Sequence, residues 1–183
     1  AIHEDPSLAH HYTWAGRNVA IITDGTAVLG LGDIGPQAAL PVMEGKAQLF
    51  QRFVGLNGVP IVLDTTNVDE MFDTICRIAP SFGAINLEDI SAPRCFELEK
   101  RLKNHLNIPV MHDDQHGTAI ISCAGLVNAL EVAGKKISEA RIVVNGAGAA
   151  AISCARLYCA FGVKKENLVM LDSKGVISVD RTD

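Results

Sequence analysis

Six short runs rich in β-branched residues, each followed by polar side chains, constrain the fold of this 183-residue chain more than any other feature. They lie at residues 19–24, 59–64, 83–89, 108–114, 141–146 and 167–172. Runs of this length and composition predict buried strands. The segments between them predict helices over residues 41–53, 68–79, 93–106, 117–133 and 148–162. Because strands alternate with helices, the sequence predicts an α/β fold with a parallel sheet.

Composition narrows the class of protein. The chain is 48% hydrophobic and 20% charged, which is typical of a globular domain and argues against intrinsic disorder. Its net charge of −5 is spread along the sequence, so we expect no nucleic-acid partner. Asn128, Glu131 and Arg156 interrupt the longest weakly polar stretches, so we predict no membrane segment. The 5 cysteines form no C-x-x-C pair, which favours free thiols and a cytoplasmic location.

The character of the sequence changes near residues 115–140, where a long predicted helix leads through Gly134 into a new strand. We therefore predict two domains, residues 1–114 and residues 115–183. The second domain contains only the first strand–helix–strand unit of a Rossmann-type nucleotide-binding domain. For this reason we expect the chain to be a piece of a longer protein.

A glycine motif joins the fifth strand to the following helix, and the next strand ends in Asp172. Gly146 permits a tight turn, Gly148 lets the backbone approach a pyrophosphate, and Ala151 lets the helix pack closely on the sheet. This context predicts a dinucleotide site. The predicted cofactor-binding residues of the motif are Gly146, Ala147, Gly148, Ala149 and Ala151. The alternative is a tight strand-to-helix turn without a ligand.

Asp172 and Lys174 bear on the choice between NAD and NADP. The Asp172 carboxylate can accept hydrogen bonds from a ribose 2′-hydroxyl, which favours NAD, whereas Lys174 can pair with a 2′-phosphate. Both residues are therefore predicted to contact the cofactor, and the sequence leaves NAD and NADP open. Asp172 can also be a turn-starting aspartate in the sequence Asp-Ser-Lys-Gly.

Two strands of the first domain end in paired carboxylates, Glu88-Asp89 and Asp113-Asp114. The carboxyl ends of parallel strands share one edge of a sheet, and gathered carboxylates repel one another unless a cation neutralises them. Oxygen ligands favour Mg²⁺ or Mn²⁺. The alternatives are helix-capping roles for each pair, or a zinc site that uses His112 and His116.

Lys46 is the candidate catalytic base. Within the predicted helix it lies on the same apolar stripe as Val42, Leu49, Phe50 and Phe53. Burial disfavours the charged form of an amine, so a buried lysine can act as a general base. The alternative is a lysine whose stem packs on apolar residues while its ammonium group stays in water.

Five motifs in order and register resemble the bacterial malic enzymes along nearly the whole chain. They are TDGTAVLGLGDIG (23–35), PVMEGK (41–46), INLEDI (85–90), HDDQHGTA (112–119) and VVNGAGAAAI (143–152). Members that continue into a phosphate-acetyltransferase-like domain are among the most similar. The resemblance implies a malic-enzyme-like N-terminal α/β domain followed by a Rossmann-type domain. It also implies oxidative decarboxylation of L-malate to pyruvate and CO₂, with NAD or NADP, a Mg²⁺ or Mn²⁺ ion, and a homo-oligomer (dimer or higher).

Site residues follow from the resemblance, position by position. The lysine of PVMEGK is Lys46, which the family uses as general base. Glu88, Asp89 and Asp114 match the metal ligands of the family. Asp113 matches the neighbouring aspartate, which we expect to be a partner of the lysine.

The chain departs from the family pattern at two places. Tyr12 does not lie in the context of the family's tyrosine acid, which we expect upstream of this chain. Thr26 and Ala27 stand where animal-type relatives carry a substrate-binding arginine, so the residue that holds the malate carboxylate is not assigned.

Two other functions stay open on the sequence alone. One is a non-catalytic dinucleotide-binding or assembly module that keeps the fold. The other is an α/β dehydrogenase that acts on amino acids with a lysine base and needs no metal. The clustered carboxylates favour the metal-dependent enzyme, because a silent module has no physical need for them.

Overall fold

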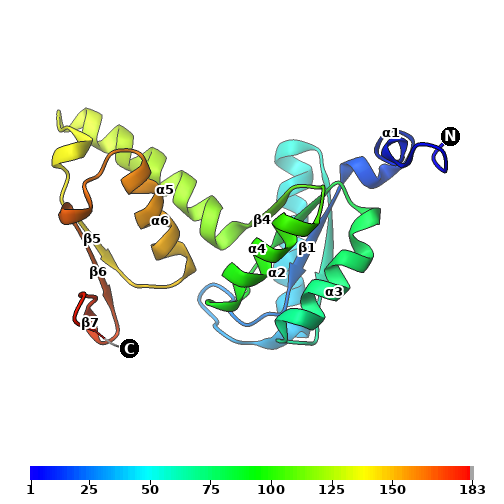
Figure 1. Ribbon diagram of the computed structural model, residues 1–183, viewed down its shortest axis with the longest axis horizontal. Coiled ribbons are helices and arrows are strands. Elements are labelled where there is room, and N and C mark those ends of the chain that lie inside the picture. Colours follow the sequence, from blue (N-terminus) through cyan, green and yellow to red (C-terminus); the bar gives the residue numbers. More distant parts are fainter. Residues whose placement is uncertain (182–183) are drawn as a thin grey trace. The chain divides into compact units, whose positions relative to one another are not determined.

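The computed structural model describes residues 1–181, and the chain divides into two compact units between His112 and Asp113. Figure 1 labels their helices and strands. The first unit contains α1 (Ala9–Tyr12), β1 (Asn18–Thr23), α2 (Gly35–Val54), β2 (Asn57–Val62), α3 (Val68–Ile78), β3 (Ala84–Leu87), α4 (Arg94–His105) and β4 (Val110–His112). The second contains α5 (Asp113–Val132), β5 (Ile142–Asn145), α6 (Ala149–Ala160), β6 (Leu168–Asp172) and β7 (Gly175–Val176).

The first unit is built on a parallel sheet with the strand order β2-β1-β3-β4, which confirms the predicted fold class. All six residues of β1 are buried, so this strand forms the centre of the core. Helix α2 packs on β1 and β2 from one face, and α4 lies in front of the sheet in Figure 1. The strand order reverses at β1, so the carboxyl ends of β1 and β3 flank a topological switch point, where α/β sheets bind ligands.

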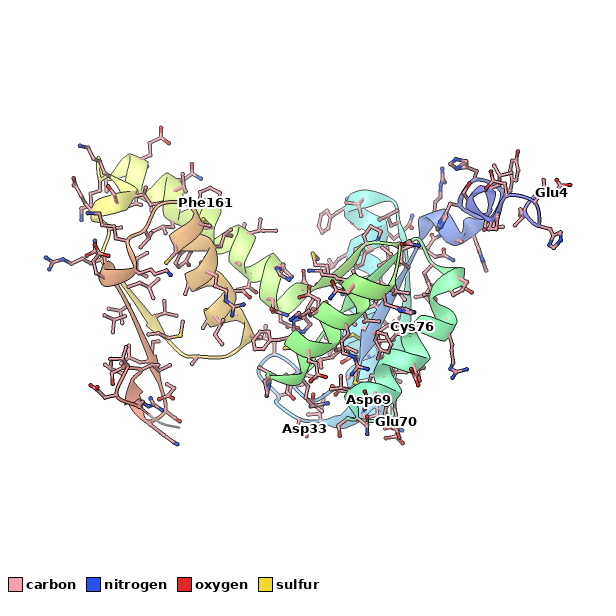
Figure 2. All side chains as sticks on the ribbon, viewed as in Figure 1. Glu4, Asp33, Asp69, Glu70, Cys76 and Phe161 are labelled. Carbon is pink, nitrogen blue, oxygen red and sulfur yellow. The ribbon has the colours of Figure 1, made fainter. Side chains whose placement is uncertain are left out.

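Helices α3 and α4 pack together. The side chain of Asn67 caps α3 by accepting hydrogen bonds from the amides of Asp69 and Glu70, at 2.8 and 3.3 Å. Figure 2 labels both acidic residues at this end of α3, where negative charge stabilises the helix through its dipole. On α4, Leu98 and Leu102 are fully buried one turn apart, as their spacing predicts.

Two helices begin earlier than the sequence predicts. Helix α2 starts at Gly35 and contains Pro41, although we expected this helix to start at residue 41. Pro36 explains the early start, because its fixed φ suits the first turn of a helix. Helix α5 starts at Asp113, directly after β4, although we expected it to start near Gly117. The negative charges of Asp113 and Asp114 interact favourably with the positive end of the helix dipole in the first turn.

The second unit pairs α5 with α6 and carries a three-stranded sheet in the order β5-β6-β7. Strands β5 and β6 are parallel, as predicted, and the short β7 adds an antiparallel hairpin that the sequence did not predict. Among the described residues, no helix is long and apolar enough to cross a membrane.

The described cysteines are free thiols. Burial raises the pKa of the Cys123 thiol, and the neighbouring Cys154 adds to this effect. Burial, with a contribution from Asp73, also raises the pKa of Cys76 on α3. Because thiols with a raised pKa stay protonated near neutral pH, these two cysteines are poor nucleophiles.

Candidate active site

The carboxylates lie at the carboxyl ends of the adjacent strands β3 and β4. In the register of the sheet Leu87 is opposite His112, so the pairs Glu88-Asp89 and Asp113-Asp114 follow the two strands at the same level. One ligand atom from each of Glu88, Asp89 and Asp114 lies within 4.8 Å of the others. This donor set is all oxygen and contains neither His112 nor His116, so it suits Mg²⁺ or Mn²⁺ better than zinc.

Two polar side chains contact the carboxylate of Glu88. The Lys46 ammonium group lies 3.1 Å from Glu88 Oε2 and donates a hydrogen bond to Oε1 at 3.2 Å. The side-chain amide of Asn86 donates to Oε2 at 2.8 Å. Asn86 and Glu88 are both buried, so charge-assisted bonds hold this carboxylate in a nearly dry environment. The Lys46 ammonium group and the Asn86 amide thus both contact one carboxylate of the three-residue group.

Lys46 reaches this point from α2, whose buried face differs from the predicted one. The core residues of α2 are Ala39 and Met43, and Lys46 follows one turn later at the edge of their face. Three residues that we expected on the buried stripe are exposed: Val42, Leu49 and Phe53. The prediction was wrong because α2 carries apolar residues on two faces and only one of them packs on the sheet.

Asp89 adopts an unusual backbone conformation. Its φ is +54°, the only positive φ of a non-glycine residue among the described residues. The backbone amide of Ala27 donates to the carbonyl of Asp89 at 3.0 Å. Left-handed backbone costs a residue with a Cβ about 1–2 kcal/mol, so contacts from the rest of the fold must support it.

Asp113 and Asp114 lie in the first turn of α5 and do not precede that helix as caps. A Cβ on Gly117 would lie only 2.4 Å from a carboxylate oxygen of Asp113, one turn away. Gly117 therefore makes room for the Asp113 side chain, which explains a glycine inside this helix.

The glycine motif forms the turn between β5 and α6. Gly146 has a φ of +130°, a conformation that favours glycine, and α6 begins directly after Gly148. A Cβ on Gly148 would meet no atom within 4 Å, and no side chain of the described residues caps α6. Uncapped amides at a helix N-terminus suit a phosphate group. Ala147, Ala149 and Ala151 are half-buried around this turn.

Asp172 has a partner that the sequence reasoning missed. The two terminal nitrogens of Arg181 donate hydrogen bonds to the two carboxylate oxygens of Asp172, each at 2.9 Å. The amide of Lys174 also donates to Asp172 at 2.8 Å, so Asp172 starts the turn between β6 and β7 as well as ending the strand. Arg181 follows Asp172 by nine residues across a turn, and no motif in the sequence marks their pairing.

Arg94, Asp24 and Thr26 form a second missed group, which joins the loops after β1 and β3. Arg94 donates to Asp24 at 2.8 Å and to Thr26 at 3.0 Å. No sequence motif points to a pair about 70 residues apart. Asn86, in contrast, could have been found, because residues two apart on a strand share one face and Glu88 follows it at that spacing.

The fold and the site together define an α/β protein with a glycine turn at the N-terminus of α6 and a cluster of carboxylates. Residues 6–103 match the family described as malic enzyme, N-terminal domain, and residues 115–183 match malic enzyme, NAD binding domain. The chain belongs to the malic enzyme family.

Relatives of known sequence support this assignment. An NADP-dependent malic enzyme of Halomonas elongata is 56% identical over 182 residues, which cover 100% of this chain and 43% of that protein. An NAD-dependent malic enzyme of Geobacillus stearothermophilus is 55% identical over 182 residues, covering 100% of this chain and 38% of that protein. A crystal structure of an NAD-dependent malic enzyme from Thermotoga maritima matches with a TM-score of 0.94 and 46% identity, covering 98% of this chain and 47% of that chain. The chain spans less than half the length of these relatives.

Proposed function

We propose that the full protein to which this chain belongs converts L-malate and NAD or NADP into pyruvate, CO₂ and the reduced cofactor, with the help of Mg²⁺ or Mn²⁺. The observation that carries this proposal is the contact of Lys46 with Glu88 inside the carboxylate group Glu88, Asp89 and Asp114. The names of the relatives, all malic enzymes that use NAD or NADP, support the same reaction.

The roles of the residues follow from this reaction. Glu88, Asp89 and Asp114 would hold the divalent cation, which supplies a Lewis acid next to the substrate when it is bound. Lys46, in its neutral form, accepts the proton of the malate C2 hydroxyl while the C2 hydride moves to the nicotinamide. The bond between C3 and the departing carboxylate then breaks, and C3 later receives a proton. Asp113 would keep Lys46 in position.

The acid that protonates C3 is not assigned to any residue of this chain. Tyr12 is exposed and lies before β1, so it is not proposed for this role. The residue that holds the malate carboxylate is likewise unassigned.

The turn at residues 146–151 would hold the pyrophosphate of the cofactor. NAD or NADP dependence agrees with the family assignment, and NADP is our proposal for the preferred cofactor. Arg181 and Lys174 support it, because both are cationic and lie at the end of β6, where a 2′-phosphate would need counter-charge. Asp172 would then serve mainly to orient Arg181.

Several features of the whole protein stay predictions. The domains would be residues 1–114 and 115–183, the assembly a homo-oligomer (dimer or higher), and the location cytoplasmic. Nucleic acid is not an expected partner.

The test combines metal binding with turnover in the full-length protein. Glu88→Gln, Asp89→Asn and Asp114→Asn should each raise the dissociation constant of Mn²⁺ by about 10-fold or more and lower kcat, because each removes a charged ligand. Glu97→Gln is the matched control, since Glu97 is an exposed carboxylate on α4. Parental Mn²⁺ affinity in the three variants would contradict the metal site, and turnover without added metal would favour a metal-free dehydrogenase. A parent protein that binds cofactor but never oxidises malate would favour the non-catalytic module.

A further inference from the structure

We propose that Asp24, Thr26 and Arg94 form a loop clamp that holds Asp89 in its left-handed conformation and thereby prepares it to bind the cation. These are positioning residues, because none of them belongs to the carboxylate group. The inference rests on the proposed function only in assigning Asp89 to the cation.

The guanidinium group of Arg94 is the centre of the loop clamp. One terminal nitrogen donates to Asp24 Oδ2 and to the carbonyl of Thr66, both at 2.8 Å. The other donates to Thr26 Oγ1 at 3.0 Å and to Ser91 Oγ at 2.9 Å. All four hydrogens of the two terminal nitrogens therefore have acceptors in the protein. No pair of terminal N–H groups is left to bind a substrate carboxylate side-on. Arg94 therefore differs from an arginine that binds substrate.

Asp24 fixes Arg94 and Thr26 at once. Its side chain is 0% exposed and pairs with Arg94 at 2.8 Å, so the arginine neutralises a buried charge. The other carboxylate oxygen accepts hydrogen bonds from the amide and the hydroxyl of Thr26, at 3.1 and 2.6 Å. The loop after β1 is thereby closed on itself.

Thr26 and Ala27 connect the loop after β1 to the loop after β3 by hydrogen bonds. Its hydroxyl oxygen accepts a hydrogen bond from the amide of Ser91 at 3.0 Å. The next residue, Ala27, donates to the carbonyl of Asp89 at 3.0 Å. These two bonds enclose the segment 89–91 from both ends, and Asp89 is the residue with a φ of +54°. The two bonds thus support the left-handed backbone of Asp89, which brings its carboxylate into the group with Glu88 and Asp114.

The position of the loop clamp agrees with this role. Both loops leave the carboxyl ends of β1 and β3, at the switch point of the sheet.

A pair of variants at Thr26 gives the sharpest test in the full-length protein. Thr26→Val keeps the size of the side chain but removes the hydroxyl, whereas Thr26→Ser keeps the hydroxyl. Titration of Mn²⁺ followed by electron paramagnetic resonance should show a dissociation constant raised about 10-fold or more in Thr26→Val and unchanged within about twofold in Thr26→Ser. The dissociation constant of the nicotinamide cofactor should be unchanged in both, which separates a local effect from general damage to the fold.

A second pair tests Arg94. Arg94→Met should weaken Mn²⁺ binding as Thr26→Val does. Arg101→Met is the matched control, because Arg101 lies on the same helix and also pairs with an acidic residue of another element, Asp69 at 2.7 Å. Asp69 is labelled in Figure 2. If Arg94→Met and Thr26→Val act through one loop, the double variant should bind Mn²⁺ about as weakly as the weaker single variant.

The outcomes separate the two proposals. A parent protein that does not bind Mn²⁺ would overturn the metal site and the loop clamp together. A parent that binds Mn²⁺, with Thr26→Val and Arg94→Met at parental affinity, would overturn the loop clamp alone. Equal loss of metal and cofactor binding in these variants would also overturn it, because it would show a general structural role.

Discussion

Lys46 and a bound cation would compete for the same carboxylate. Both oxygens of Glu88 lie within 3.2 Å of the Lys46 ammonium group, and Asn86 takes a further position on Oε2. A cation bound at Glu88 would repel a charged lysine and favour its neutral form, which is the form that a general base requires. The ion pair and the proposed catalytic state are therefore linked through one carboxylate.

Replacing Lys46 tests its role as a base. In the full-length protein Lys46→Ala should lower kcat by about 10²–10⁴-fold, which is the usual contribution of a positioned acid or base. Binding of the nicotinamide cofactor should survive, because the cofactor turn lies elsewhere in the chain. Lys100→Ala is the control, since Lys100 is exposed on α4. A kcat close to that of the parent would return Lys46 to the role of a solvated lysine.

The pair of Asp172 and Arg181 leads to a prediction about cofactor choice. Arg181→Met removes a cation from the proposed 2′-phosphate site and releases the carboxylate of Asp172 to accept a ribose hydroxyl. The ratio of kcat/KM for NADP to that for NAD should fall by about 10-fold or more, because a hydrogen bond to a charged group contributes about 1.5–3 kcal/mol.

Arg141→Met serves as the control for this experiment, because Arg141 is exposed and directly precedes β5. A strong preference of the parent protein for NAD would show that Asp172, and not Arg181, governs the choice of cofactor. In that case Lys174→Ala should leave the ratio of kcat/KM for NADP to that for NAD unchanged.

At the scale of elements, the sequence predicted the strands better than the helix boundaries. The runs ending near Thr23 and Asp172 have the composition that a buried strand needs, and each strand falls within a few residues of its predicted range. Helix starts were missed at Gly35 and Asp113, where glycine and paired aspartates resemble loops. The buried face of α2 was missed because a sequence does not show which of two apolar faces meets the sheet.

Some residues of the candidate site could be predicted from the sequence and others could not. The carboxylates after β3 and β4 were predictable, because adjacent parallel strands end at the same edge. Lys46 was identified by its motif PVMEGK, whereas the apolar stripe that first pointed to it is largely exposed. The loop clamp was not predictable. Arg94 and Asp24 are 70 residues apart in the sequence, and only the packing of α4 on the sheet brings them together. Local patterns predict residues that a strand or helix positions, and they miss residues that tertiary contacts bring together.

The packing of α2 on β2 gives a prediction at this scale. A Cβ on Gly58 would lie 2.6 Å from Ala47 Cα and 2.8 Å from Ile21 Cδ1, so Gly58→Ala must push α2 away from the sheet. Such overpacking should lower the free energy of unfolding by about 1–3 kcal/mol. Because Ala47 is next to Lys46, the change should also lower kcat.

Gly45→Ala is the matched control on the same helix. A Cβ on Gly45 would meet no atom within 4 Å, so the variant should raise the free energy of unfolding by up to about 1 kcal/mol through helix propensity. Urea unfolding of both variants measures the difference. Equal stability of the two variants would show that α2 does not pack closely on β2 at Gly58.

At the scale of the whole molecule, the two units differ in how deeply their strands are buried. Every residue of β1 is buried, and the core of the first unit includes Ile21, Ile85 and Leu87. In the second unit, no residue of β5 or β6 is fully buried. Since strand amides exchange through openings whose free energy depends on local burial, the two units should differ in stability.

Hydrogen exchange followed by mass spectrometry measures this difference directly in the 183-residue chain. Peptides that contain β1 and β3 should exchange at least about 10-fold more slowly than peptides that contain β5 and β6, which corresponds to about 1.4 kcal/mol of opening free energy. The rates are first corrected for the intrinsic exchange of each sequence, so that composition does not contribute. Helices α5 and α6 provide an internal comparison, because they pack on each other and bury Cys123 and Cys154. They should exchange more slowly than β5. Equal protection of β1 and β5 would show that the second unit is stabilised by contacts that its burial pattern does not reveal.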